Sequence, residues 1–145
     1  MKIALASDHA GMKLKDCLAG FLKRSGVSFH DFGVYSEESV DYPDFAFAVA
    51  NAVQTGEYTF GILICGTGIG MSIAANKYSG IRAALCSETY SARCAREHNN
   101  ANVLTMGSRV IGPGIANEIV AAFLQTGFAG GRHENRLNKI TELEK

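Results

Sequence analysis

The stretch Phe60-Gly61-Ile62-Leu63-Ile64-Cys65-Gly66-Thr67-Gly68-Ile69-Gly70 decides the fold. Its first six residues are apolar without alternation, which is typical of a strand buried on both faces of a parallel sheet. Three closely spaced glycines then predict a tight turn, and the small residues after it predict a short helix ending near Gly80. A strand that leads through a turn into a helix is the repeating unit of α/β proteins.

The same alternation of strand and helix continues on both sides of this unit. Further strands are predicted at residues 3–6, 27–32, 81–86 and 102–106, and helices at 14–22, 41–53, 88–98 and 116–124. Strands joined by crossover helices form a parallel sheet with helices on both faces. The sequence therefore predicts a single α/β domain over residues 1–145, a three-layer Rossmann-like sandwich with a five-stranded parallel sheet. The charged tail, residues 132–145, is expected to form a C-terminal helix that is exposed or packed on a partner.

The composition excludes several classes of protein. The chain is 47% hydrophobic and 19% charged, unlike a disordered chain or a fibre. Its 14 Lys and Arg balance 14 Asp and Glu, so no global field favours nucleic acid or an anionic membrane surface. The 4 cysteines show no paired spacing, and no apolar run is long enough to span a bilayer. We therefore expect a cytoplasmic protein with reduced thiols that binds a small anion at a local site.

The glycine turn is the strongest candidate for that site. Ligands of parallel α/β sheets bind beyond the carboxyl ends of the strands, and backbone N–H groups converge in a turn of this kind. The turn lacks the lysine of a P-loop, and Met71 or Ile73 stands where a dinucleotide fingerprint needs its third glycine. Glu88, at the end of the next strand, nevertheless leaves a nucleotide site open. The other alternative is a turn that only packs a helix against the sheet.

Cys65 is the last strand residue before this turn. A cysteine in an apolar strand is usually a small core residue, but a thiol beside convergent amides ionises more readily. Cys65 is thus a candidate nucleophile or base. Cys17, Cys86 and Cys94 fall inside predicted helices or a strand, and we expect them to be packing residues.

Charged and imidazole side chains at the element ends are further candidates. Asp8 and His9 follow the first strand, where an aspartate also serves as a helix cap. No two histidines have metal-ligand spacing, so no metal site is predicted. Arg132 and Arg136 are four residues apart, so one helical face carries both guanidinium groups and suits a phosphate dianion, with a solvated tail as the alternative. Arg109, after the fifth strand, is a third candidate for the same anion.

Seven short motifs carry a resemblance to a known family. In chain order they are Ser7-Asp8-His9-Ala10-Gly11, Asp41-Tyr42-Pro43, Cys65-Gly66-Thr67-Gly68-Ile69-Gly70, Gly80-Ile81-Arg82-Ala83, His98-Asn99, Gly107-Ser108-Arg109 and Gly130-Gly131-Arg132-His133. Together they resemble ribose-5-phosphate isomerase B, whose wider family also contains allose-6-phosphate and galactose-6-phosphate isomerases. The resemblance implies an aldose–ketose isomerase that acts on a sugar phosphate without metal, nucleotide or other cofactor. It also implies a homodimer, or a dimer of dimers, with an active site shared between two chains.

The resemblance further implies which residues are catalytic. Cys65 would remove the C2 proton of the sugar, and Thr67 would help move protons between the substrate oxygens. His98, with Asp8 nearby, would open the sugar ring.

The substrate-binding residues are implied in the same way. The enediolate would be held by the backbone amides of Gly66, Gly68, Ile69 and Gly70. The phosphate would be held by His9, Arg109, Arg132 and Arg136. Asn99 would contact sugar hydroxyls, and Tyr42 is a further candidate for a sugar contact.

Several alternatives stay open at this point. The substrate is either ribose 5-phosphate or a six-carbon sugar such as allose 6-phosphate or galactose 6-phosphate. A nucleotide-binding module and a redox protein that uses Cys65 are the alternatives from other classes. The chain carries both the Cys65 group and the His98 group of residues, which favours an oligomer of identical chains. One departure from the family pattern is Asn100, where we expect an acid in many relatives.

Overall fold

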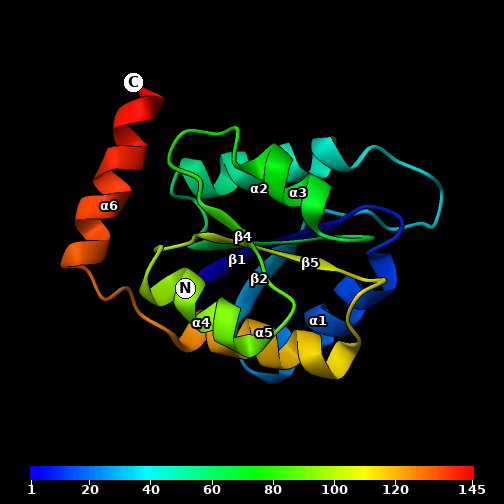
Figure 1. Cartoon of the computed structure of the whole chain (residues 1–145). Coiled ribbons are helices and arrows are strands. Elements are labelled where there is room, and N and C mark those ends of the chain that lie inside the picture. Colours follow the sequence, from blue (N-terminus) through cyan, green and yellow to red (C-terminus); the bar gives the residue numbers. More distant parts are fainter.

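The computed structural model describes all 145 residues, and its centre is a five-stranded sheet (Figure 1). The strands are β1 (Lys2–Ser7), β2 (Ser28–Asp31), β3 (Phe60–Cys65), β4 (Ala83–Leu85) and β5 (Val103–Gly107). Their spatial order is β2-β1-β3-β5-β4, and every neighbouring pair is parallel. The predicted α/β sandwich with a parallel sheet is confirmed.

Helices cover both faces of this sheet. They are α1 (Met12–Arg24), α2 (Tyr42–Gln54), α3 (Ile69–Ala75), α4 (Thr89–Glu97), α5 (Pro113–Gln125) and α6 (Arg132–Thr141), with a final 3₁₀ turn at Glu142–Glu144. Figure 1 shows α2 and α3 on one face, and α1, α4 and α5 on the other. None of these helices combines the length and the apolar character that a bilayer crossing requires.

A hydrophobic core lies on each face of the sheet. Successive strand residues point to opposite faces, so β3 contributes to both cores. Ile62 and Ile64 pack in the core formed with α1, α4 and α5, whereas Leu63 and Cys65 pack in the core formed with α2 and α3. The prediction of a strand buried on both faces is confirmed, and the side chain of Cys65 is assigned to the α2–α3 side.

The strand order reverses between β1 and β3. After β1 the chain continues to β2 on one side, and it then crosses over to β3 on the other. Ser7 pairs with Ile64 in the sheet, so Asp8 and Cys65 lie side by side where the two strands end. The N–H of Asp8 also donates to the carbonyl oxygen of Ile64 at 3.1 Å. Ligands of open α/β sheets bind at such a switch in strand order.

Strand β4 is shorter than predicted, because it begins at Ala83 rather than at residue 81. Side chains take the place of a strand partner here. The N–H of Ala83 donates to Oδ1 of Asn76, and Nδ2 of Asn76 donates back to the carbonyl oxygen of Ala83. The N–H of Arg82 donates to Oδ1 of Asn102. These contacts satisfy backbone groups that a longer strand would have paired.

The last helix, α6, projects from the body of the molecule (Figure 1). None of its residues is buried, and it follows Gly130 and Gly131, which both have positive φ angles of 66° and 56°. Glycine adopts such angles without the steric cost that other residues incur. The predicted C-terminal helix is present, and one long face of it has no covering element within the chain.

Candidate active site

A cavity of about 420 Å³ opens where β1 and β3 end. Its lining combines residues from the ends of three strands and from the starts of two helices. They are Asp8, Tyr42, Cys65, Gly66, Thr67, Ile69, Gly70, Ile73 and Arg109. The structure therefore brings together most of the residues that the sequence predicted around the glycine loop.

The thiol of Cys65 lies at the base of this cavity. The residue is only 5% exposed, and the N–H of Gly68 donates to its sulfur at 3.1 Å. A hydrogen bond from an amide is stronger to an anionic sulfur than to a neutral one. The loop thus places an amide donor directly on the sulfur atom that would act as a base or a nucleophile.

The glycine loop is held in one conformation by close packing. Gly68 has a φ of 81°, and a Cβ there would lie 2.5 Å from Cδ1 of Leu85 and 2.8 Å from the carbonyl carbon of Met106. The buried hydroxyl of Thr105 donates to the carbonyl oxygen of Gly68 at 3.0 Å. Gly107, at the end of β5, leaves room for the backbone of Thr67. A Cβ added to Gly107 would lie 2.6 Å from the carbonyl oxygen of Thr67. Glycine is required at these positions because the backbones approach too closely for a side chain.

Two polar side chains flank the thiol. The buried carboxylate of Asp8 accepts a hydrogen bond from the N–H of Gly11 at 3.1 Å. Asp8 therefore stabilises the turn before α1 and lines the cavity, whereas the N-cap residue of α1 is Gly11. The hydroxyl of Thr67 is exposed to the cavity and accepts from the N–H of Ile69 at 3.3 Å. Its own proton is free to reach a ligand.

Arg109 covers one side of the glycine loop. A Cβ built on Gly66 would lie 3.0 Å from a guanidinium nitrogen of Arg109, and the N–H of Arg109 donates to the carbonyl oxygen of Gly66 at 3.0 Å. No carboxylate pairs with this guanidinium. On the other side, the ring of Tyr42 would lie 2.6 Å from a Cβ on Gly70. The cavity thus has a free cation on one wall and an aromatic ring on another.

His9 lies beside the cavity and is tied to the loop that leads into α2. The N–H of Val40 donates to Nδ1 of His9 at 3.2 Å. In a neutral imidazole the nitrogen that accepts carries no proton, so this bond assigns the proton to Nε2. Nε2 is therefore the nitrogen that can donate to a ligand.

A second group of predicted residues lies elsewhere. The rings of His98 and His133 stack at 4.4 Å between centroids with an interplanar angle of 13°, and Arg132 and Arg136 lie close enough to affect His133 electrostatically. Partial burial, and then the charges of His98, Arg132 and Arg136, lower the pKa of His133. Neither arginine forms an ion pair with a carboxylate. Asn99 adjoins this cluster, in a groove that it lines with Leu137 of α6.

The topology explains why the two groups are apart. Helix α4 connects β4 to β5, which are parallel strands, so it must run back along the sheet. It begins at the carboxyl ends of the strands, and His98 follows its last turn at the opposite end. Within one chain, the Cys65 group therefore lies at the carboxyl ends of the strands, and the His98 group lies at their amino ends. The expectation that Arg109, Arg132 and Arg136 surround one anion is not met within a single chain.

Glu88 has a structural role in the fold. Its carboxylate caps α4 by accepting from the N–H of Ser91 at 2.9 and 3.0 Å, and these bonds lower the pKa of Glu88. Its position at a strand end, which had suggested a ribose-binding acid, is accounted for by this cap.

Sequence reasoning missed three residues that shape the site. Thr105 anchors the glycine loop, Ser108 Oγ donates to the carbonyl oxygen of Ala10 at 2.7 Å and so joins two loops, and His133 stacks on His98. Thr105 looks like an ordinary strand residue that no pattern distinguishes, whereas Ser108 stood in the quoted motif Gly107-Ser108-Arg109. His133 stood in a quoted motif directly after Arg132, and that position was the available signal.

A thiol under an amide loop, with an unpaired guanidinium above it, defines a site for the chemistry of a small anionic substrate. Residues 3–140 match the model of a family described as Ribose/Galactose Isomerase. The chain belongs to this family, and it is an aldose–ketose isomerase.

Individual relatives resemble the chain along nearly its whole length. Ribose-5-phosphate isomerase B of Escherichia coli is 51% identical over 144 residues, which are 99% of this chain and 97% of that protein. A solved structure of ribose-5-phosphate isomerase B from Clostridium thermocellum has 55% identity and a TM-score of 0.98, and the match covers 99% of this chain and 97% of that one. D-erythrulose-4-phosphate isomerase of Pectobacterium atrosepticum is 45% identical over 145 residues, covering 99% of this chain and 95% of that protein.

Proposed function

We propose that this protein interconverts ribose 5-phosphate and ribulose 5-phosphate through an enediolate, as a step of pentose phosphate metabolism. The observation that carries the proposal is the convergence of Cys65, the glycine loop and Arg109 in one cavity, in a chain of this family. The similarity to ribose-5-phosphate isomerase B of Escherichia coli supports the choice of substrate.

Cys65 acts as the base in this mechanism. Its thiolate takes the proton from C2 of the open-chain aldose, and the electron pair of that bond forms the C1–C2 double bond while negative charge moves onto O1. The backbone amides of Gly66 to Gly70 stabilise this enediolate. Donors that are already in place supply the largest part of such stabilisation, because they need no reorganisation as charge develops. The protonated Cys65 then returns its proton to C1, which completes the ketose.

Thr67 and His98 handle the remaining protons. The proton on O2 must move to O1, and the hydroxyl of Thr67, which lines the cavity, is the group suited to relay it. Opening of the sugar ring needs an acid and a base at the ring oxygen and the anomeric hydroxyl. His98 performs this step with Asp8 nearby, and Asn99 and Tyr42 contact the sugar hydroxyls.

The phosphate is held by His9, Arg109, Arg132 and Arg136. Because these residues are divided between the two edges of one chain, the complete site requires a second copy. We propose a homodimer, alone or paired into a tetramer, in which the His98–Arg132–Arg136 group of one chain faces the Cys65 cavity of the other. A two-fold axis completes two such sites at once.

Exposed apolar residues around the cavity support this dimer. Ile69 and Ile73 line the cavity and are 52% and 59% exposed, and Leu85 on the edge strand is 41% exposed. Apolar side chains that gather at the mouth of a polar site are typical of a protein interface. A partner seated on them would also exclude water from the reacting carbons.

The test is proton NMR of ribose 5-phosphate with the protein in deuterated water. We expect ribulose 5-phosphate to appear, with deuterium at C1 to the extent that the Cys65 thiol exchanges its proton with solvent before it protonates C1. Cys65→Ala should lower kcat at least 10³-fold, roughly the effect of removing a catalytic base, while sugar-phosphate binding survives. Cys17→Ala, a cysteine on the exposed face of α1, is the matched control and should be fully active. A Cys65→Ala enzyme that keeps its activity would contradict the assignment of the base.

The same assay decides the length of the sugar. No turnover of ribose 5-phosphate, together with turnover of allose 6-phosphate or galactose 6-phosphate, would contradict the five-carbon substrate but keep the reaction. The four-carbon D-erythrulose 4-phosphate belongs in the panel, because a relative at 45% identity is named for it. Nucleotide binding with no turnover of any sugar phosphate would contradict the enzyme function as a whole.

A further inference from the structure

The C-terminal arm, residues 132–145, carries two of the four proposed phosphate ligands but has few contacts with the body of the chain. Its helix buries no residue. At its near end, His133 stacks on His98, and Leu137 and Ile140 line a groove of about 410 Å³ beside β4. The arm forms no ion pair with the rest of the chain. A small number of contacts therefore fixes the direction of the arm.

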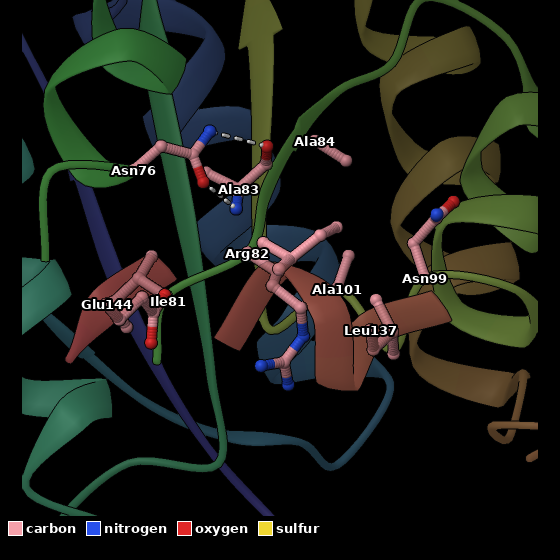
Figure 2. Close-up of a pocket in the computed structure, with 10 residues that line it drawn as sticks. Asn76, Ile81, Arg82, Ala83, Ala84, Asn99, Ala101, Leu137 and Glu144 are labelled. Carbon is pink, nitrogen blue, oxygen red and sulfur yellow. Dashed lines mark hydrogen bonds between the residues drawn. The ribbon is translucent and has the colours of Figure 1, made fainter. Parts of the chain in front are cut away.

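Glu144 makes the only side-chain hydrogen bonds between this arm and the rest of the chain. One carboxylate oxygen, Oε2, accepts from the hydroxyl of Ser79 at 3.0 Å and from the N–H of Gly80 at 2.9 Å. Burial lowers the pKa of Arg82, and the nearby charge of Glu144 offsets part of this effect. Figure 2 shows Glu144 at one end of the groove and Asn99 at the other.

The turn that receives Glu144 is itself firmly held. Nε2 of Gln54 donates to the carbonyl oxygen of Ser79 at 2.8 Å, and Nδ2 of Asn102 donates to the carbonyl oxygen of Gly80 at 2.9 Å. Gln54 ends α2 and Asn102 directly precedes β5. The anchor point is thus connected to both the helical layer and the sheet, and it does not move with the arm.

The other end of the arm is joined to the body of the chain through two glycines with open surroundings. Gly130 and Gly131 have φ angles of 66° and 56°, and no atom lies within 4 Å of a Cβ built on either. Arg136 lies between this pair and Glu144, about 12 Å along the helix from the latter at 1.5 Å per residue. An arm that can swing at one end points in a fixed direction only if the other end is attached.

We infer that Glu144 is a positioning residue, which holds Arg132 and Arg136 in the direction needed to bind the substrate phosphate. The inference rests on the proposed function, because it takes those arginines as phosphate ligands. Glu144 touches no reacting atom. Glu144 only aligns the arginines, so its loss removes phosphate binding that the ground state and the transition state share, and this raises KM chiefly.

The test compares three variants for KM and kcat with ribose 5-phosphate. Glu144→Ala should raise KM about fivefold, the factor that one net hydrogen bond contributes, with kcat unchanged. Glu144→Gln keeps an oxygen that accepts both hydrogen bonds and should restore most of the wild-type KM. Glu142→Ala is the matched control, since the side chain of this exposed glutamate in the same turn makes no hydrogen bond, and it should behave as the wild type.

Hydrogen exchange provides a readout that does not depend on activity. Amides of α6 should exchange faster in Glu144→Ala than in Glu142→Ala, while those of the sheet stay protected. A wild-type protein that turns over ribose 5-phosphate, with the same KM in all variants, would overturn the inference and leave the proposed function intact. A fall in kcat in Glu144→Ala without a rise in KM would overturn it as well. A wild-type protein with no sugar-phosphate turnover would instead refute the proposed function.

Discussion

The four cysteines have different surroundings, although each is a free thiol. Cys65 receives an amide hydrogen bond at the base of a cavity. Burial, and then the charge of Glu88, raise the pKa of Cys86 to about 11, so Cys86 stays protonated and inert at neutral pH. Cys17 is exposed on α1. The reactivity of each cysteine depends on the hydrogen-bond donors and charges around its sulfur. The position of the residue in a strand indicates only which part of the fold surrounds it.

Asn100 shows how a single residue departs from the expected pattern. It has a positive φ of 44°, which asparagine and aspartate tolerate better than most residues. Its Oδ1 accepts from the guanidinium of Arg96 at 2.9 Å. Arg96 is buried between the rings of Phe60 and Phe123, and its Nε has no partner. Burial, and then the charge of Arg82, lower the pKa of Arg96.

We predict that Asn100→Asp stabilises the protein. The new carboxylate would turn a hydrogen bond with one charged partner into an ion pair with the buried guanidinium, a gain of about 1 kcal/mol. The expected rise in Tm is about 3 °C for a chain of this size, measured by calorimetry. Asn138→Asp on the exposed face of α6 is the control and should leave Tm within error. A lower Tm for Asn100→Asp would show that Arg96 needs no anion.

Helix α6 is the element whose stability should depend on pH. The pKa of His133 is lowered in the folded protein by partial burial and then by His98, Arg132 and Arg136. An unperturbed histidine titrates near about 6.5, so below that pH the released arm binds a proton more readily than the docked one. Docking of α6 is therefore fully stable above about pH 6.5 and weakens as the pH falls through this value.

We expect the amides of α6 to lose protection from hydrogen exchange between pH 7 and 5.5, after correction for intrinsic rates. His133→Asn removes the titrating group and should flatten this dependence. Inorganic phosphate should oppose the loss, because an anion between Arg132 and Arg136 offsets the positive charges that disfavour the protonated ring. An equal pH dependence in wild type and His133→Asn would assign the effect to another group.

Helices and strands differed in how well they could be predicted. The apolar run of β3 and its glycine turn predicted both a buried strand and the α3 start, because burial on two faces leaves no alternation. The beginning of β4 was placed two residues early, because side chains of Asn76 and Asn102 replace the strand partner there. The charge content of α6 predicted a helix that is exposed or packed on a partner, but its sequence does not show in which direction the helix projects. The direction of α6 depends on the positive φ angles of Gly130 and Gly131 and on the hydrogen bonds of Glu144.

At the scale of the whole molecule, the main result is the division of the predicted site. The glycine loop and its neighbours could be grouped from sequence because they follow strand ends at one edge of the sheet. His98, Arg132 and Arg136 could be identified by motif, but their position relative to Cys65 depends on the direction of α4. Crossover topology sends the end of that helix to the opposite edge. The homodimer proposed above would reunite the two groups.

This division predicts that two inactive variants restore each other. Cys65→Ala lacks the base, and Arg132→Ala/Arg136→Ala lacks half of the phosphate ligands, so each alone should be nearly inactive at low substrate concentration. A mixed dimer has one intact site and one site with both defects. Random reassociation makes half of the dimers mixed, so the refolded mixture should recover about a quarter of the wild-type rate. Each variant refolded alone is the control, and a mixture no better than these would place the whole site within one chain.

The projecting α6 and the returning α4 have a consequence for dilution. If catalysis needs groups from two chains, a single chain is a folded protein without turnover, and specific activity is a measure of association. At concentrations well above the dimer dissociation constant the rate is proportional to the amount of protein. Below it, the rate falls with the square of that amount. A cell that makes too little of this chain would then lose the reaction faster than it loses the protein.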